Sequence, residues 1–147
     1  MFPNTSFIRE LNVMAIKRKP TVLSVVINST ETSSTAEATL RLRADHDILD
    51  FSGHFSQFPL LPGVTQIDWA IFYAQDILHV PSTFQGMEVI KFQEPILPDA
   101  EIALHLKWDA EKLKLHFAYH SERDGQLIAH SSGKVQLANI TNSNQRL

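Results

Sequence analysis

The chain has 147 residues, of which 44% are apolar and 20% are charged, and its formal net charge at pH 7 is -3. This length suits one core, so we expect a single domain spanning residues 1–147. The slight negative charge argues against a general nucleic-acid-binding surface, and we expect no nucleic-acid partner. The absence of cysteine excludes disulfides, thiolate catalysis and cysteine-ligated metal sites.

The first twenty residues contain Arg9, Glu10 and the basic run Lys17–Lys19 without a continuous apolar stretch. Such a segment resembles neither a secretory signal nor a membrane span. We therefore expect a cytoplasmic protein without a membrane partner.

Two β-strands are predicted in the first third of the chain. Residues 21–28 are rich in β-branched side chains, and residues 36–43 alternate apolar with polar side chains. The polar stretch between them, residues 29–35, suits the connection of an antiparallel pair.

One long helix is predicted immediately after Gly63. Apolar side chains recur there at the spacing of one helical face, at Val64, Ile67, Ile71, Ala74 and Leu78, and the segment ends before Pro81. Its other sides are also largely apolar, which is typical of a helix enclosed by a sheet.

Four further strands are predicted downstream, at residues 88–92, 101–108, 113–119 and 127–137, with polar turns at residues 109–112 and 122–125. The order of elements is two strands, one helix and four strands. It indicates an α+β fold with the helix in the core.

The segment that carries chemistry joins a loop containing His54 to the start of the helix. Pro62 suits a helix start because its φ angle is preset and it lacks the N–H that would be unpaired there, while Gly63 allows a ligand to approach the backbone closely. The free N–H groups and the positive end of the helix dipole would face a negatively charged or polarised oxygen. This arrangement predicts an oxyanion site.

Asp68 lies one turn beyond Val64, at the margin of the predicted apolar stripe. Burial there would favour a protonated carboxyl that donates a proton, while a neutral His54 accepts one, and elimination of water needs such a pair. Taken singly, a loop histidine is more often a surface residue, and an aspartate early in a helix is often stabilised by the helix dipole. Combined with the helix start at Pro62, the catalytic interpretation is favoured.

A family resemblance rests on the spacing of three short segments, Gly53-His54-Phe55, Pro59-Leu60-Leu61-Pro62-Gly63-Val64, and Asp68 fourteen positions after the histidine. The chain resembles the hotdog-fold 3-hydroxyacyl-[acyl-carrier-protein] dehydratases of fatty acid synthesis, and Asp68 resembles the acid of the decanoyl-type enzymes. Residues 66–70, 91–98 and 106–109 look closer still to the dehydratases of aryl polyene biosynthesis. The resemblance covers about residues 22–137.

The resemblance implies a hotdog fold, in which an antiparallel sheet wraps a long central helix, and a dimer with each active site in a tunnel at the subunit interface. His54 of one subunit would take the proton from C2, Asp68 of the other would protonate the departing 3-hydroxyl, and the Gly63 N–H would hold the thioester oxygen. The expected substrate contacts are Phe55, Leu61, Pro62 and Val64. The implied partners are acyl carrier protein and a second hotdog subunit, identical or different, and no metal or organic cofactor is implied.

Three residues depart from the family pattern. Ser56 and Gln57 stand where the family usually has proline and glycine, and Phe72 stands where a glutamine commonly supports the acid. Gln75 is the alternative amide, but the interpretation does not depend on it. Two alternatives therefore stay open, a hotdog acyl thioesterase and a non-catalytic partner subunit of a dehydratase heterodimer, and a dehydratase of this kind could also isomerise the double bond.

The remaining histidines and the basic residues are assigned no catalytic role. His105, His116 and His120 fall on predicted strands, where four residues span about 13 Å, too far for one metal ion. His46, His79 and His130 are expected to be surface or capping residues. The basic residues that could contact an acidic carrier protein, although solvation alone explains each of them, are Lys17, Arg18, Lys19, Arg41, Arg43 and Lys91.

Overall fold

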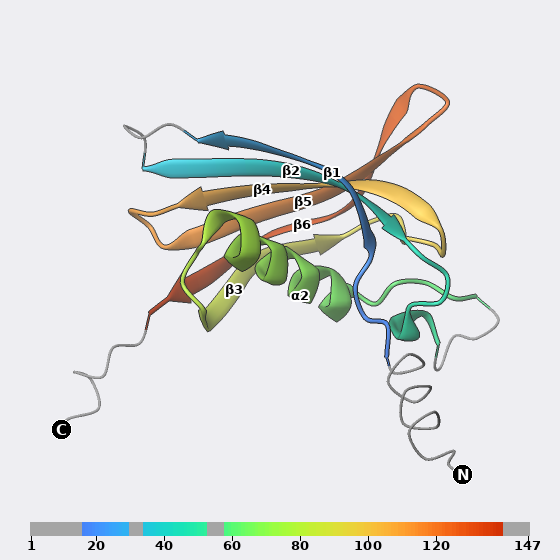
Figure 1. Cartoon of the computed structure of the whole chain (residues 1–147), viewed down its shortest axis with the longest axis horizontal. Coiled ribbons are helices and arrows are strands. Elements are labelled where there is room, and N and C mark those ends of the chain that lie inside the picture. The colour runs from blue at the N-terminus through green and yellow to red at the C-terminus, as the bar shows by residue number, and fades with distance from the viewer. Residues whose placement is uncertain (1–15, 30–33, 53–57, 140–147) are drawn as a thin grey trace, which may run out of the picture.

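The computed structural model describes residues 16–29, 34–52 and 58–139. Its elements in chain order are strands β1 (Thr21–Ser29) and β2 (Thr35–Ala44), the 3-10 helix η1 (Leu49–Phe51), helix α2 (Gly63–Tyr73) with its π-helical continuation η2 (Ala74–Leu78), and strands β3 (Thr83–Phe92), β4 (Ala100–Asp109), β5 (Lys114–Arg123) and β6 (Gln126–Ala138). Helix α2 lies against one face of the sheet (Figure 1).

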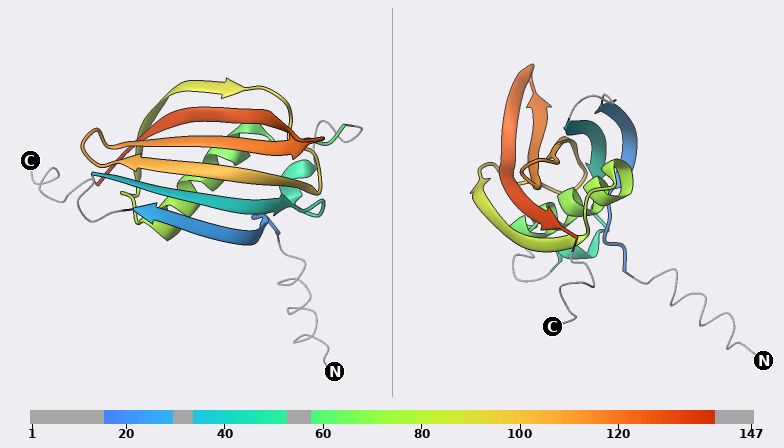
Figure 2. Two further views of the ribbon diagram at one scale, coloured as in Figure 1. Left: turned by 90° about the horizontal axis from the view of Figure 1, so that it is seen from above. Right: turned by 90° about the vertical axis from the view of Figure 1, so that its left-hand side faces the viewer.

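The six strands form one antiparallel sheet in the order β1-β2-β4-β5-β6-β3. Pairing is regular between β2 and β4, which stay in one register from Thr35 opposite Asp109 to Ala44 opposite Ala100. Pairing is irregular at both edges, because β1 and β3 each shift register against their neighbours. The sheet curves around α2, as the two views of Figure 2 show.

Alternation along the central strands decides which side chains reach the helix. The inward residues of β2, β4 and β5 are large and apolar, and many of them are fully buried, among them Leu40, Leu42, Leu104, Leu106, Leu115 and Tyr119. Trp69, Ala70 and Ala74 of the helix are buried in the same core. Each fully buried leucine contributes roughly 1.5–3 kcal/mol, so this layer between helix and sheet is the main source of stability.

The predicted helix is confirmed, with one irregularity at its carboxyl end. It begins at Gly63 and continues to Leu78, but its last five residues, Ala74–Leu78, are π-helical. His79 then adopts a left-handed conformation with φ 56° and ends the helix two residues before Pro81.

The predicted strands are confirmed as elements, but several bounds were wrong. Strand β3 begins at Thr83 rather than at residue 88, and β5 runs on to Arg123, so residues 122 and 123 belong to a strand and not to the turn. Leu113, expected in a strand, lies in the preceding turn with φ 56°. The 3-10 helix η1 was not predicted, because three residues are too few to show periodicity.

The predicted apolar stripe of the helix was wrong at its first residue. Val64 is 74% exposed, and the buried side chains of the first two turns include the polar Thr65 and Gln66. These polar residues can be buried because both are hydrogen-bonded to other parts of the protein. The architecture as a whole is the α+β hotdog arrangement, a central helix enclosed by an antiparallel sheet. In the described residues, no helix combines the length and apolar character needed to cross a membrane.

Candidate active site

The site is organised by the amino end of α2. Pro62 is the N-cap residue, with φ -60° and ψ 149°, and its carbonyl accepts hydrogen bonds from the N–H groups of Thr65 at 3.1 Å and Gln66 at 3.2 Å. The two N–H groups before them, those of Gly63 and Val64, have no partner within the helix, and the first N–H groups of a helix carry the positive end of its dipole. The predicted helix start at Pro62 and Gly63 is therefore confirmed.

Gly63 is explained by a neighbour within the chain. A Cβ at this position would lie 2.5 Å from the ring of Phe92 at the end of β3, so a side chain here would require that ring to move. The close approach that was expected from a ligand is made here by this ring. A role for the Gly63 N–H towards a thioester oxygen stays a prediction.

Asp68 is exposed in the single chain, so the expectation of a partly buried position at the edge of the apolar stripe was wrong. Val64 one turn before it and Phe72 one turn after it are also exposed, and the three together form the outward face of α2. The buried face is set by Trp69, Ala70 and Tyr73 instead. Within the part of the chain that the structure describes, no hydrogen bond to the Asp68 carboxylate is found.

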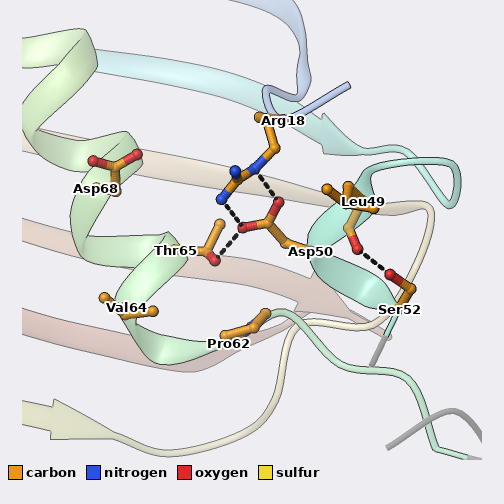
Figure 3. Close-up of a pocket in the computed structure, with 8 residues that line it drawn as sticks. All are labelled: Arg18, Leu49, Asp50, Ser52, Pro62, Val64, Thr65 and Asp68. Atoms are coloured by element: carbon orange, nitrogen blue, oxygen red, sulfur yellow. Dashed lines mark hydrogen bonds and ion pairs between the residues drawn. The ribbon is translucent and has the colours of Figure 1, made fainter. Parts of the chain in front are cut away.

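Asp68 borders an open pocket with a volume of about 680 Å³ at this end of the helix (Figure 3). The lining residues come from the N-terminal segment, from η1 and its surroundings, and from the start of α2: Arg18, Leu49, Asp50, Ser52, Pro62, Val64, Thr65 and Asp68. The structure thus brings together three residues that the sequence predicted for the site, Pro62, Val64 and Asp68.

The other predicted site residues are placed differently. Leu61, an expected substrate contact, is buried in the core at 1% exposure and does not border the pocket. His54 and Phe55 lie outside the described residues, in the segment 53–57 that follows the pocket residue Ser52. The pairing of His54 with Asp68 therefore stays a prediction.

A hydrogen-bonded ion pair beside Asp68 was not predicted. Asp50 accepts two hydrogen bonds from the Arg18 guanidinium, at 2.6 Å from Nε and 3.1 Å from the terminal nitrogen, and one from the Thr65 hydroxyl at 2.6 Å. Burial alone would raise the pKa of Asp50, but these hydrogen bonds and the charge of Arg18 hold the pKa below its usual value. No sequence signal joins residues 18, 50 and 65, because they share neither a motif nor a period.

Buried hydrogen bonds fix the orientation of α2. The Gln66 side chain donates to the Leu61 carbonyl at 3.2 Å and accepts from the Ser131 hydroxyl at 2.6 Å. The Tyr119 hydroxyl donates to the Gln66 carbonyl at 2.7 Å, and the Trp69 indole donates to the Arg18 carbonyl at 2.8 Å. The helix is thereby attached to β5, to β6 and to the N-terminal segment.

The family position of a supporting glutamine is filled by an aromatic ring. Phe72 packs edge-on against Tyr73, with ring centres 5.0 Å apart, and Lys19 Nζ lies 4.5 Å from the centre of the Phe72 ring. The alternative amide of Gln75 donates to the Ser82 carbonyl at 3.4 Å. Neither residue supplies a hydrogen bond to Asp68.

The strand histidines are confirmed on β4 and β5, where His105 and His120 contact each other with ring centres 5.5 Å apart. The expectation for His130 was wrong, because this residue is buried at 4% exposure. Its Nδ1 donates to the Glu94 carbonyl at 2.8 Å, and its Nε2 accepts from the Ser121 hydroxyl at 2.7 Å. In the described part of the chain, no group of three or more histidine or acidic side chains has the arrangement of a metal site.

Most of the basic residues considered for carrier binding form ion pairs within the chain. Lys17 pairs with Asp45 and Asp47, Arg43 also pairs with Asp45, and Arg41 pairs with Glu101. These contacts account for the positions of the three cations without a partner protein.

The sequence matches the family model described as ApeI dehydratase over residues 28–134. The chain belongs to the ApeI-like dehydratase family. A FabZ 3-hydroxyacyl-[acyl-carrier-protein] dehydratase of Nitratidesulfovibrio vulgaris is 36% identical to this ApeI-like chain over 106 residues, which cover 63% of the chain and 64% of the relative. The chain thus spans just under two thirds of the length of the curated relatives it matches.

Two solved structures share both fold and sequence with this ApeI-like chain. An uncharacterised protein from Erwinia carotovora subsp. atroseptica is 40% identical, with a TM-score of 0.74 over 82% of this chain and 97% of that one. The dehydratase heterocomplex ApeI:P from Xenorhabdus doucetiae is 34% identical, with a TM-score of 0.66 over 82% of this chain and 99% of that one. The chain is therefore a hotdog protein of the FabZ and ApeI kind.

Proposed function

We propose that this chain dehydrates a 3-hydroxyacyl thioester, carried on acyl carrier protein, to the trans-2-enoyl thioester in fatty acid or aryl polyene type biosynthesis. Family membership supports the reaction class. The observation that carries the proposal is the pocket at the amino end of α2, which is bordered by both the Asp68 carboxylate and the first residues of the helix. The residue that we propose as proton donor and the first turn of the helix therefore border one pocket.

The proposed chemistry assigns three roles. His54 takes the proton from C2, and the electron pair of that C–H bond forms the C2–C3 double bond as the bond from C3 to the hydroxyl oxygen breaks. Asp68 donates a proton to this oxygen, which leaves as water. The Gly63 N–H would stabilise the negative charge that develops on the thioester oxygen. The Pro62 and Val64 side chains, at the pocket wall, and Phe55 would contact the acyl chain.

A second hotdog subunit is part of the proposal, because His54 and Asp68 would come from different chains. Strand β3 supports this, since it is an edge strand with four large exposed apolar side chains, Phe84, Met87, Val89 and Phe92. Unprotected apolar edges of this kind are suited to pairing with another strand. The partner is either a second copy or a different hotdog chain.

The alternative of a non-catalytic partner subunit is favoured by one comparison and one contact. The relative from Xenorhabdus doucetiae is a dehydratase heterocomplex. In addition, Phe72 stands where the family pattern has a glutamine, so Asp68 has no amide hydrogen bond from this position. The Phe72 ring contacts Tyr73 and Lys19 instead. A partner subunit would contribute only part of each site.

The test uses the purified full chain and 3-hydroxyacyl carrier protein with alkyl or aryl-conjugated acyl groups. We expect the acyl carrier to lose the mass of one water, and His54→Ala to abolish this loss. His46→Ala is the matched control, because His46 is an exposed histidine that pairs with Asp99. Full activity in His54→Ala would refute the assignment, release of free thiol without enoyl product would indicate a thioesterase, and activity only with a second hotdog chain would indicate a partner subunit.

A further inference from the structure

One residue of β3 has a backbone conformation that its own side chain disfavours. Val89 has φ 54°, in the left-handed region, where a β-branched residue is a rare and strained outlier. The other described non-glycine residues with positive φ lie in turns or directly after the helix, where this conformation is common: His79, Asp99, Leu113 and Asp124. Val89 lies within a strand instead.

Val89 and its neighbour Ile90 form a β-bulge. The pairing of β3 with β6 shifts register between Glu88 and Lys91. Val89 and Ile90 therefore lie opposite one residue of β6, Gly133. Ile90 packs over Gly133, where a Cβ would clash with its side chain, and against the core, whereas Val89 is 64% exposed. The bulge thus directs one apolar side chain to the core and leaves the other in solvent.

The fold of the single chain does not explain a valine at position 89. Glycine or asparagine would adopt the same φ with less strain, and neither would remove the contact that Ile90 makes. The exposed Val89 side chain gains no burial that offsets its strain. Strained residues that persist are concentrated at functional sites, and β3 is an edge strand with one unpaired side (Figure 2). This combination indicates that a partner at this edge buries Val89.

The side-chain pattern of β3 fits a second copy of the same strand. The register with β6 places Glu88 and Lys91 on one face of β3, and Met87 and Phe92 on the other. When two copies run antiparallel about a twofold axis at the bulge, Glu88 of each copy lies opposite Lys91 of the other, and Met87 lies opposite Phe92. Glu88 binds Lys114 in its own chain through one oxygen, at 2.7 Å, which leaves its second oxygen for this contact.

We propose that β3 pairs with β3 of a second copy of this chain across a twofold axis at the bulge, and that the strained Val89 side chain is buried in this interface. The inference names the partner within the proposed function and rests on its two-subunit site. It assigns Val89 to assembly rather than to folding.

The first test separates assembly from folding. Val89→Gly removes the strain, so the Tm should rise by roughly 2–4 °C at a protein concentration too low for dimers. The same substitution should weaken the homodimer by at least about tenfold in sedimentation velocity, because the side chain is lost from both subunits. Val89→Asn, which also tolerates positive φ, should change both quantities in the same directions.

Leu113→Gly is the matched control for this test. Leu113 is also an apolar residue with positive φ, 56°, but it lies in the turn before β5. Its replacement should relieve strain without changing dimerisation. Equal dimerisation of Val89→Gly and the wild type would overturn the role of Val89, and it would indicate a bulge that serves only to place Ile90 in the core.

The second test determines the register of the pairing, and it uses the absence of cysteine from the chain. In the double variant Glu88→Cys/Lys91→Cys, the Cα atoms of the two cysteines in one strand are roughly 8–10 Å apart, too far for a disulfide. Across the interface the two positions would be about 5 Å apart, so mild oxidation should link two copies. Each single variant should stay unlinked. A double variant that also stays unlinked would overturn the proposed register.

The outcomes differ from those that test the proposed function. A wild-type chain that is monomeric, or that is active only with a different hotdog chain, would overturn the homodimer and leave dehydration standing. A homodimer linked through β3 that forms no enoyl product would refute the proposed function and leave this interface standing.

Discussion

Gln66 and Asp68 are polar residues close together on one helix, but they differ in burial and in hydrogen bonding. Gln66 is buried, and both its amide group and its carbonyl are hydrogen-bonded to other elements. Asp68 is exposed and makes no hydrogen bond with any other described residue. A polar group without partners contributes little to folding, so Asp68 is better explained by chemistry than by stability.

Asp68→Asn should therefore separate activity from stability. We expect dehydration to fall by about 10²–10⁴-fold, the usual contribution of a general acid. The free energy of unfolding should change by less than about 0.5 kcal/mol, as for exposed sites generally. Urea denaturation and the carrier-protein assay measure the two effects. Asp76→Asn, at an exposed aspartate two turns along, is the control that should leave both unchanged, and an active Asp68→Asn would remove the acid from the mechanism.

Gly63→Ala tests the contact with Phe92. The new methyl group would lie 2.5 Å from the ring, so the ring must move, and we expect a loss of about 1 kcal/mol in stability. In a Phe92→Ala background the clash is absent, and the same change should stabilise the protein, because alanine is favoured over glycine in a helix by roughly 0.5–1 kcal/mol. Thermal or urea unfolding of the four proteins gives the coupling. The same sign in both backgrounds would argue against the contact.

At the scale of elements, Asp45 joins the end of β2 to the start of β1. It accepts hydrogen bonds from Thr21 at 2.5 Å and from Arg43 at 2.6 Å, and it pairs with Lys17 at 3.2 Å. Burial alone would raise the pKa of Asp45, but these partners lower it to about 2. The edge strand β1 is thus attached by a carboxylate that must stay ionised.

This attachment predicts a pH dependence of stability. Because the pKa of Asp45 falls from 3.8 to about 2 on folding, its contribution is present above pH 3.8 and is lost as the pH falls towards 2. We expect Asp45→Asn to lose roughly 1–2 kcal/mol at pH 7 and to show a flatter decline below pH 4 in urea unfolding. The exposed Asp47→Asn should follow the wild type. Parallel curves for Asp45→Asn and the wild type would contradict the assignment.

Strand β3 is the element on which assembly is proposed to depend. Met87→Lys places a charge on this exposed edge, and we expect it to weaken dimerisation by at least about tenfold in sedimentation velocity. Val26→Lys is the matched control on the opposite edge strand β1, where Val26 is also exposed. Equal effects of both substitutions would show that the dimer does not form through β3.

The sequence predicted regular elements better than irregular ones, for a physical reason. Apolar and polar side chains alternate over residues 36–43 because one face of β2 packs against the core, so this strand can be predicted from the sequence. The first half of β3 is an edge with a register shift between Phe84 and Gly86, and its largely exposed side chains give no alternation. The face of α2 was misjudged because Thr65 and Gln66 are buried through hydrogen bonds that only the folded chain creates.

The site was predictable to the extent that it is local. Pro62, Gly63 and Asp68 follow one another on a single helix, so their relation could be derived from spacing. Arg18 and Asp50 reach the same pocket from distant parts of the chain, and only the fold brings them together. The proposed site would extend this limit further, because a site that spans two subunits is contained in no single chain.

At the scale of the whole molecule, the claim that one active site uses His54 of one subunit and Asp68 of the other can be tested with mixed dimers. His54→Ala and Asp68→Asn chains are co-expressed with different tags, and the mixed dimer is purified and assayed with 3-hydroxyacyl carrier protein. Each parent homodimer should be inactive. The mixed dimer should retain about half of the wild-type rate, because one of its two sites combines both intact residues. A mixed dimer as inactive as its parents, beside an active wild type, would contradict a site shared between subunits.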